Sequence, residues 1–212
     1  MNDINTKTMK KISCGRICQL RRCIPDDFQT YLYWQSNGEW LQYDAPWEAD
    51  NAIQTPDGIE RYRTKFMKRC EEDQSSPFRR ATIINNQDKP VGWVSRYVDN
   101  NNNTNWYVGI DICENDYMNK GIGTEALLLW INYLFEESDI HKVSLNTWSY
   151  NKRMIHVAEK IQMIKEGIER EKRQWKNNWI HRYHFGILRD EWRKAKIYKG
   201  VVQKNNECEE NV

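Results

Sequence analysis

Two glycines separated by a single residue, Gly121 and Gly123, stand between a stretch typical of a β-strand and a stretch typical of a helix. Residues 106–113 are aromatic and β-branched, whereas the apolar residues from 126 to 135 recur at helical spacing. Glycine lets a ligand approach the backbone closely, and the N–H groups at a helix N-terminus attract anions. The loop is therefore a candidate pyrophosphate site, with Lys120 adding a positive charge at its rim.

The same glycines have a structural explanation, namely a tight turn followed by close packing of the first helical turn. Two other phosphate-binding motifs do not match. A P-loop needs Lys and then Ser or Thr directly after its last glycine, and the chain contains no Gly-Lys pair. A dinucleotide-binding fingerprint needs three glycines in one turn, which this loop lacks.

The segment from Met118 to Gly123 resembles the coenzyme A loop of the GNAT acyltransferases, whose pattern is Gln or Arg, two residues, Gly, one residue, then Gly or Ala. Both glycines match this pattern. The resemblance runs from about Ile17 to Trp192 and is closest to the Rim-type branch, which acetylates the amino termini of ribosomal proteins. The other segments that carry it are LRR (20–22), PDD (25–27), KVSLN (142–146), NKRM (151–154) and FGILRDEW (185–192).

The resemblance implies one α/β (α+β) domain with a mixed, mostly antiparallel sheet, whose two central strands splay apart and are flanked by helices. It also implies that the pantetheine arm of acetyl-CoA, the acyl donor, lies in the gap like an added strand against the backbone near Ile112 and Cys113. Asn151 would contact the same arm, although an Asn there also suits a helix N-cap. The residues expected at the cofactor are Ile112, Cys113, Met118, Asn119, Lys120, Gly121, Ile122, Gly123, Thr124 and Asn151.

Two departures from the family pattern affect the expected chemistry. Met118 occupies the position of the Gln or Arg, so that contact to the phosphates is missing. Relatives keep a Tyr seven residues after the helix Asn, or a Ser three residues after it, as the acid that protonates the leaving thiolate; this chain has Ala158 and Met154 there. A thiolate with a pKa near ~8.5 can leave with the help of solvent. The acid is therefore left unassigned.

A base is needed because an ammonium must lose a proton before it attacks a thioester, and a carboxylate or a bound water can take that proton. Asp111 and Glu114 are the nearest carboxylates in the sequence and are the candidate catalytic residues. Asp111 alternates with Gly109 and Cys113 along the strand, which favours a narrow, partly buried face; the alternative is a solvated edge carboxylate. Glu114 has the alternative role of a cap before the loop.

The acceptor side is expected in the irregular segment around Trp40, Tyr43 and Trp47, which in proteins of this kind lines the cleft opposite coenzyme A. These aromatic residues lie close to the carboxylates of Asp44 and Glu48, and both kinds of group suit a cationic amine. A packed Ω-loop is the alternative interpretation.

A second wall is expected from a hairpin that turns at residues 175–179. His181, or His184 after it, could relay a proton near neutral pH, although half-buried strand histidines are commoner. This exposed hairpin is also a plausible surface for a homodimer.

Composition favours one ordinary domain. The chain has 212 residues and a formal net charge of +2, so no basic field argues for a nucleic-acid partner. Residues 1–11 lack the apolar run of a signal peptide, and no stretch approaches the ~20 apolar residues of a membrane span. A cytoplasmic protein without a membrane partner is therefore expected. Cys14, Cys18 and Cys23 lack the spacing and nearby His of a zinc site, so no metal is expected.

The pattern along the chain predicts a polar leader at 1–11, a domain at 12–195 and a charged, disordered tail at 196–212. The expected order of elements begins with a strand at 12–20 and a helix from Asp26, followed by the irregular segment. A basic helix at 57–72, strands at 78–84 and 90–97, and a hairpin connection at 100–103 come next.

Two functions from different classes follow. The first is an N-acetyltransferase that moves an acetyl group from acetyl-CoA to a primary amine of a small molecule, an antibiotic or a protein amino terminus, by direct attack in a ternary complex. The second is a noncatalytic acyl-CoA-binding or regulatory module, which the residues Met118, Met154 and Ala158 favour. The two intact glycines favour the enzyme.

Overall fold

The computed structural model describes residues 11–43, 45–48, 53, 55–72, 76–98, 103–195 and 197–201. One open sheet of eight strands runs through the molecule in the order β1-β2-β3-β4-β5-β6-β8-β7. Its strands are β1 (Lys11–Cys14), β2 (Cys18–Arg21), β3 (Arg80–Asn85), β4 (Pro90–Val98), β5 (Asn105–Ile112), β6 (Lys142–Trp148), β7 (Ile164–Trp175) and β8 (Asn178–Leu188).

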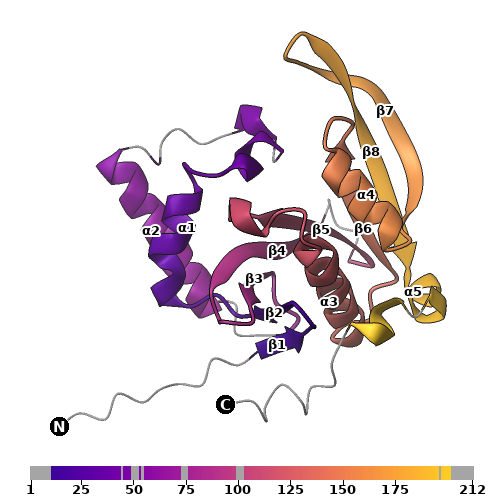
Figure 1. Cartoon of the computed structure of the whole chain (residues 1–212), viewed down its shortest axis with the longest axis horizontal. Helices are drawn as coiled ribbons and strands as arrows, with labels where there is room; N and C mark the ends of the chain where they lie inside the picture. The colour runs from indigo at the N-terminus through magenta and orange to yellow at the C-terminus, as the bar shows by residue number, and fades with distance from the viewer. Residues whose placement is uncertain are drawn as a thin grey trace.

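Helices cover both faces of the sheet. The α-helices are α1 (Phe28–Trp34), α2 (Pro56–Glu72), α3 (Ile122–Glu136), α4 (Lys152–Lys160) and α5 (Arg189–Ala195). Short 3-10 helices are η1 (Pro25–Asp27), η2 (Glu39–Gln42), η3 (Pro46–Glu48), η5 (Asn115–Tyr117) and η6 (Ile197–Gly200). Figure 1 shows α1 and α2 on one flank of the molecule and α4 with the β7–β8 hairpin on the other.

The two central strands diverge, as the sequence predicts. β5 and β6 are parallel and pair only at Asn105↔Lys142, Trp106↔Val143 and Tyr107↔Ser144. β5 then continues to Ile112 with β4 on its other edge, while β6 continues to Trp148 with β8 on its other edge. The other neighbouring strands in the sheet are antiparallel. The expected mixed, mostly antiparallel sheet with splayed central strands is therefore confirmed.

Two clusters of buried side chains hold the layers together. On one face, α3 packs Leu127, Trp130 and Leu134 onto the sheet, and all three are fully buried. On the other face, aromatic residues of α1 and α2 surround Trp93 of β4. These two cores fix the positions of the helices that flank the gap between β5 and β6.

The predicted strand at 12–20 is wrong, because these residues form the β1–β2 hairpin. The Gly15 N–H donates to the Cys18 carbonyl at 2.9 Å. The buried carboxylate of Glu125, on α3, accepts the N–H groups of Ile17 at 2.6 Å and Cys18 at 3.0 Å. A turn that depends on a carboxylate 107 residues away leaves no local signal in the sequence.

The later elements agree closely with the predicted pattern. α2 and β4 each begin and end within one residue of their expected bounds. The helix expected from Asp26 begins as the 3-10 turn η1 and continues as α1. The predicted connection at 100–103 falls largely outside the described residues, but the antiparallel pairing of β4 with β5 is the arrangement that such a connection requires.

Residues expected to begin a disordered tail are instead packed on the domain. Tyr198, in η6, stacks on Trp192 with ring centroids 5.2 Å apart, and Ile197 and Val201 also contact the core. The remaining residues of the expected leader and tail, 1–10, 196 and 202–212, lie outside the described residues.

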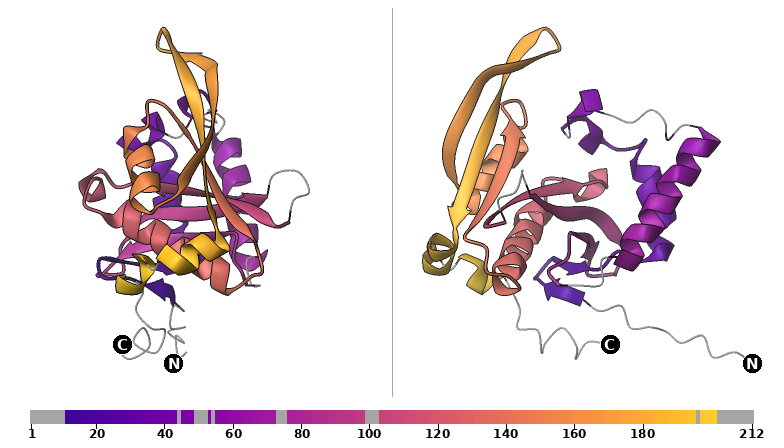
Figure 2. Two further views of the ribbon diagram at one scale, coloured as in Figure 1. Left: turned by 90° about the vertical axis from the view of Figure 1, so that its right-hand side faces the viewer. Right: turned by 180° about the vertical axis from the view of Figure 1, so that it is seen from behind.

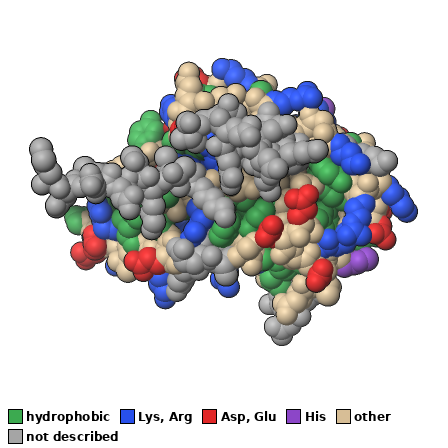
Figure 3. Space-filling view, turned by 90° about the horizontal axis from the view of Figure 1, so that it is seen from below, with side chains coloured by type: hydrophobic (Ala, Val, Ile, Leu, Met, Phe, Trp, Pro, Cys, Tyr) green, Lys and Arg blue, Asp and Glu red, His purple; other side chains and the backbone are tan. Residues whose placement is uncertain are grey.

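The β7–β8 hairpin extends well beyond the body of the molecule in every view (Figures 1 and 2). Basic and acidic side chains are both scattered over the face seen from below (Figure 3), in keeping with a net charge of +2. In the described part of the chain, every helix is too short or too polar to cross a membrane.

Candidate active site

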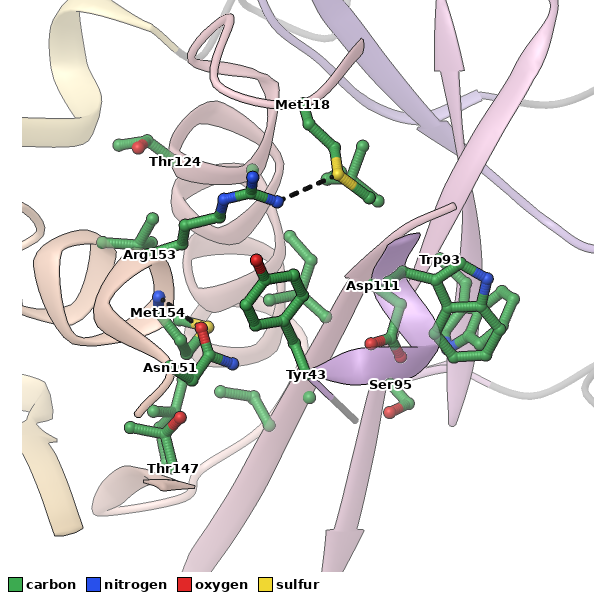
Figure 4. A pocket seen from close by; sticks show the side chains of 18 of the residues that line it. Tyr43, Trp93, Ser95, Asp111, Met118, Thr124, Thr147, Asn151, Arg153 and Met154 are labelled. Atoms are coloured by element: carbon green, nitrogen blue, oxygen red, sulfur yellow. Dashed lines mark hydrogen bonds between the residues drawn. The ribbon is translucent and has the colours of Figure 1, made fainter. Parts of the chain in front are cut away.

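The divergence of β5 and β6 opens a cleft of about 960 Å³. Residues 108–112 of β5 and 145–148 of β6 form its walls, and the glycine loop and the first turns of α4 form one side. Trp93 and Ser95 of β4 lie on the opposite side. Figure 4 shows Asp111 with Trp93 and Ser95 on one side of this space, Asn151 and Arg153 on the other, and Tyr43 between them.

The glycine loop leads directly into α3. Gly121 is the N-cap of α3 and has φ +85°, a left-handed conformation that glycine adopts readily. Asn119, two residues earlier, also has a positive φ of 58°. Gly121, Gly123 and Thr124 all line the cleft. The first N–H groups of α3, which have no acceptor within the helix, therefore lie at the cleft and can bind an anion.

The surroundings of Gly123 indicate whether this glycine serves ligand binding or packing. A Cβ atom built there would meet only the Ile112 side chain, at 3.7 Å, which is an ordinary contact. Neither packing nor backbone conformation therefore requires glycine at this position. The turn explains Gly121, but the missing side chain of Gly123 serves chiefly to keep the cleft surface clear.

One edge of β5 is open to the cleft. The Cys113 N–H donates to the Val91 carbonyl at 2.8 Å, so it is directed toward β4. Because backbone groups alternate along a strand, those of Val108, Ile110 and Ile112 are directed away from β4, into the gap. This arrangement corrects the expectation for Cys113: its N–H is already used in the sheet, and its side chain is buried beside Trp93. Ile112 lines the cleft.

Asn151 caps α4, as the sequence allows. Its Oδ1 accepts the Met154 N–H at 3.0 Å, and the residue also lines the cleft. Met154 lines the cleft as well, whereas Ala158 is fully buried. Neither position carries a hydroxyl group.

Arg153 is a site residue that the sequence reasoning missed. Its Nη1 lies 3.1 Å from the Met118 sulfur, its Nη2 lies 3.4 Å from a Glu39 oxygen, and its guanidinium covers the Tyr43 ring at 4.8 Å. It thus places a positive charge beside the loop position where relatives carry Gln or Arg. Lys120 is exposed and lies near the Tyr117 ring rather than among the residues that line the cleft.

Further basic side chains line the cleft along α4, at Lys152, His156 and Lys160. Their spacing of four residues puts them on one face of the helix. This spacing was readable from the sequence once the helix was assigned.

The two candidate bases, Asp111 and Glu114, have different surroundings in the structure. Asp111 lines the cleft and is paired across strands with Trp93. Glu114 does not line it: one carboxylate oxygen accepts the Trp34 indole N–H at 2.8 Å, and the other lies 3.2 Å from the Lys89 ammonium. The expectation for Glu114 is corrected accordingly, because both of its oxygens are engaged in contacts away from the cleft.

The expected acceptor residues take different positions. Tyr43 and Trp40 line the cleft, although Trp40 is only 6% exposed and packs edge-on against Trp93 at 5.0 Å. Trp47 instead packs against Trp148 at 4.8 Å and Trp175 at 5.2 Å, so it joins η3 to the hairpin. Asp44 lies outside the described residues.

His181 is not among the residues that line the cleft. Its Nδ1 accepts the Glu171 N–H at 2.8 Å, and its ring stacks with Tyr183. His184 bonds to Glu169 at 2.8 Å on the same hairpin. Both histidines thus have contacts within the hairpin that are typical of strand residues.

A helix N-terminus that faces a gap between two diverging parallel strands, with one strand edge open, is the arrangement that the resemblance to the GNAT acyltransferases implies for a coenzyme A site. The comparison with known proteins agrees: residues 18–164 match the acetyltransferase (GNAT) domain, and the chain belongs to this family. It is an acyltransferase whose acyl donor is acetyl-CoA and whose acceptors are amines. The comparisons give no support to a noncatalytic module.

The individual relatives have low sequence identity to this chain. The chain is 26% identical over 139 residues to the uncharacterized N-acetyltransferase YnaD of Bacillus subtilis, which covers 65% of this chain and 79% of that protein. Its fold is similar to that of RimL, a ribosomal L7/L12 acetyltransferase solved with coenzyme A (TM-score 0.68, 17% identity, 86% and 99% of the two chains). The fold is also similar to that of a spermidine N-acetyltransferase from Vibrio cholerae, solved with CoA and spermine (TM-score 0.66, 19% identity, covering 82% of this chain and 97% of that chain).

Proposed function

We propose that this protein acetylates a primary amine of a small molecule or of a peptide amino terminus, by direct attack on acetyl-CoA in a ternary complex. The observation that carries the proposal is that one cleft contains both the loop at the head of α3 and the carboxylate of Asp111. Donor and acceptor can therefore meet without a second site or a covalent enzyme intermediate.

The residues present fit acetyl-CoA, which supplies an activated acetyl group as a thioester. The N–H groups at the start of α3 would bind the pyrophosphate, and Arg153 would add a positive charge beside them. The open edge of β5 at Val108, Ile110 and Ile112 would bind the pantetheine amides as an added strand does. Asn151 lies at the end of this path, at the start of α4.

Asp111 and Asn146 are the residues that we assign to the amine. Leu145 packs into the core on the α3 side, so Asn146 points to the opposite face, the face on which Asp111 lies with Trp93. The Asn146 Oδ1 is buried without a hydrogen-bond partner, and Asn146 lines the cleft. Asp111 would take the proton of the ammonium, directly or through water, and Asn146 would hold a remaining N–H. Solvent would protonate the leaving thiolate, because Met154 and Ala158 carry no acidic group.

The experiment is thiol release from acetyl-CoA with a panel of polyamines, aminoglycosides, amino acids and amino-terminal peptides. Asp111→Asn should lower kcat by about 100-fold or more with an accepted amine, as loss of a general base does, and should leave the Kd for acetyl-CoA nearly unchanged. Asp190→Asn, at an exposed position on α5, is the matched control and should not change either constant. An unchanged kcat in Asp111→Asn would return the role of base to water.

We also propose that one domain spans residues 11–201 and that the β7–β8 hairpin pairs with a second copy of the chain. The hairpin exposes Ile164 (54%), Ile168 (51%) and Trp179 (58%), which are large apolar side chains on a projecting element. Light scattering on the purified protein tests the pairing. A dimer that Ile168→Lys converts to a monomer is expected, and a monomeric wild-type protein would contradict it.

A further inference from the structure

The acceptor side of the cleft contains two arginines that the acetyl transfer itself does not use. Arg69, near the end of α2, and Arg80, at the start of β3, both line the cleft, and so does Tyr62, on the same helix as Arg69. The guanidinium of Arg80 lies 5.1 Å from the centre of the Trp93 ring. These positive groups therefore lie on the sheet face that also carries Asp111.

Arg69 is the more unusual of the two. Its Nη1 is buried and has no hydrogen-bond partner among the described residues. A guanidinium group carries five N–H donors, and a buried charge without a partner is costly. Burial and then the charge of Arg80 lower the pKa of Arg69. Both arginines line the same cleft.

Tyr62 adds a neutral donor at the same place. Burial raises the pKa of its hydroxyl group to about 12, so the group keeps its proton at neutral pH and can donate it in a hydrogen bond. Two guanidinium groups and a phenol on one wall of a cleft make an arrangement that suits an anion rather than a second ammonium.

The sheet register relates the position of Arg80 to that of Asp111. Arg80 pairs across strands with Ser95, and Ser95 pairs with Gly109 of β5, so the three form one row. The Cα atoms of Arg80 and Gly109 are therefore two strand spacings apart, or about 10 Å. Asp111 lies two residues beyond Gly109 on the same face. The Arg80 side chain reaches the ring of Trp93, the cross-strand partner of Asp111, so the cleft has positive groups and a carboxylate on one face.

We infer that the acceptor carries an acidic group, a carboxylate or a phosphate, which Arg69 and Arg80 bind while its amine lies at Asp111. This inference rests on the proposed function and narrows its substrate class to amines that also carry an anionic group. Arg69 and Arg80 then determine specificity. An acid-free polyamine would leave the buried Arg69 Nη1 without an acceptor.

The test uses matched pairs of amines that differ only in the acid: glycylglycine with glycylglycinamide for a carboxylate, and phosphoethanolamine with ethanolamine for a phosphate. Isothermal titration of the CoA-loaded protein measures binding without any chemistry, and thiol release from acetyl-CoA measures turnover. We expect the acid-bearing member of at least one pair to bind about tenfold more tightly or better, because charge-assisted hydrogen bonds to Arg69 are involved. The pair that shows the preference identifies the acid as carboxylate or phosphate.

Arg69→Gln should abolish that preference and leave the Kd for CoA unchanged. Arg61→Gln, an exposed position on the same helix, should keep the preference and controls for a general loss of charge on α2. Equal binding of both members in both pairs, or a preference that survives Arg69→Gln in a folded protein, would overturn the inference. Binding with the expected preference but no thiol release would instead count against acetyl transfer, so the two failures are distinguishable.

Discussion

Replacing Gly123 with Ala separates the two explanations for the glycine loop. The new methyl group would meet only the Ile112 side chain, at 3.7 Å, and the backbone there needs no positive φ. Ala is also favoured over Gly in a helix by up to about 1 kcal/mol. The free energy of unfolding should therefore stay the same or rise.

Binding of acetyl-CoA should suffer in the same variant. The methyl group would stand between the loop and the pyrophosphate and displace it from at least one backbone N–H. A hydrogen bond to a charged group contributes about 1.5–3 kcal/mol, so the Kd should rise by about 10- to 150-fold. Isothermal titration gives the Kd, and urea unfolding gives the stability.

Gly167→Ala is the matched control. A Cβ at Gly167, on β7, would also meet a single side chain at ordinary distances, that of His184 at 3.7 and 3.9 Å, but Gly167 is not among the residues that line the cleft. Its Kd for acetyl-CoA should equal that of the wild type. The reasoning would be refuted if Gly123→Ala lost stability and bound acetyl-CoA normally, because the glycine would then be required for packing.

Other predictions follow from single contacts. Asp27→Ala should destabilise the fold by about 3–5 kcal/mol in urea unfolding, because it leaves the buried Arg21 charge without its bidentate partner at 2.7 Å; a loss below about 1 kcal/mol would contradict this. Arg153→Ala should raise the KM for acetyl-CoA by about 2- to 5-fold, as expected for a partly exposed charge pair, with no change in the amine preference. Cys70 should react with iodoacetamide faster than Cys18 near neutral pH, because a hydrogen bond from the neighbouring thiol lowers the pKa of Cys70 while burial raises that of Cys18; mass spectrometry of the alkylated sites decides, and the reverse order would count against the contact.

Local patterns predicted the parts of the fold that depend on neighbouring residues. The apolar spacing of α3 and the glycines before it are contiguous signals, and both identified their elements. The β1–β2 hairpin was missed because its turn is held by Glu125, which is distant in sequence. Tyr198 was assigned to a polar tail because its stacking on Trp192 depends on how the chain folds back.

The candidate site could also be predicted only in part from the sequence. The strand alternation favours Asp111 over Glu114 in the sequence, but the contacts of Glu114 with Trp34 and Lys89 depend on the fold and could not be predicted. Arg69 and Arg80 lie 11 positions apart on a helix and a strand, and no linear motif marks that they face one cleft. A cluster of charges from different elements becomes visible only after the chain is folded.

The most direct test of the account is the binding of acetyl-CoA to the wild-type protein and its thiol release with the matched amines. The account predicts saturable binding that Gly123→Ala weakens, and amine-dependent thiol release that Asp111→Asn suppresses. Thiol release that needs no amine, or acetyl-CoA binding that the glycine substitution leaves unchanged, would contradict the claim that the cleft between β5 and β6 is the site of acetyl transfer.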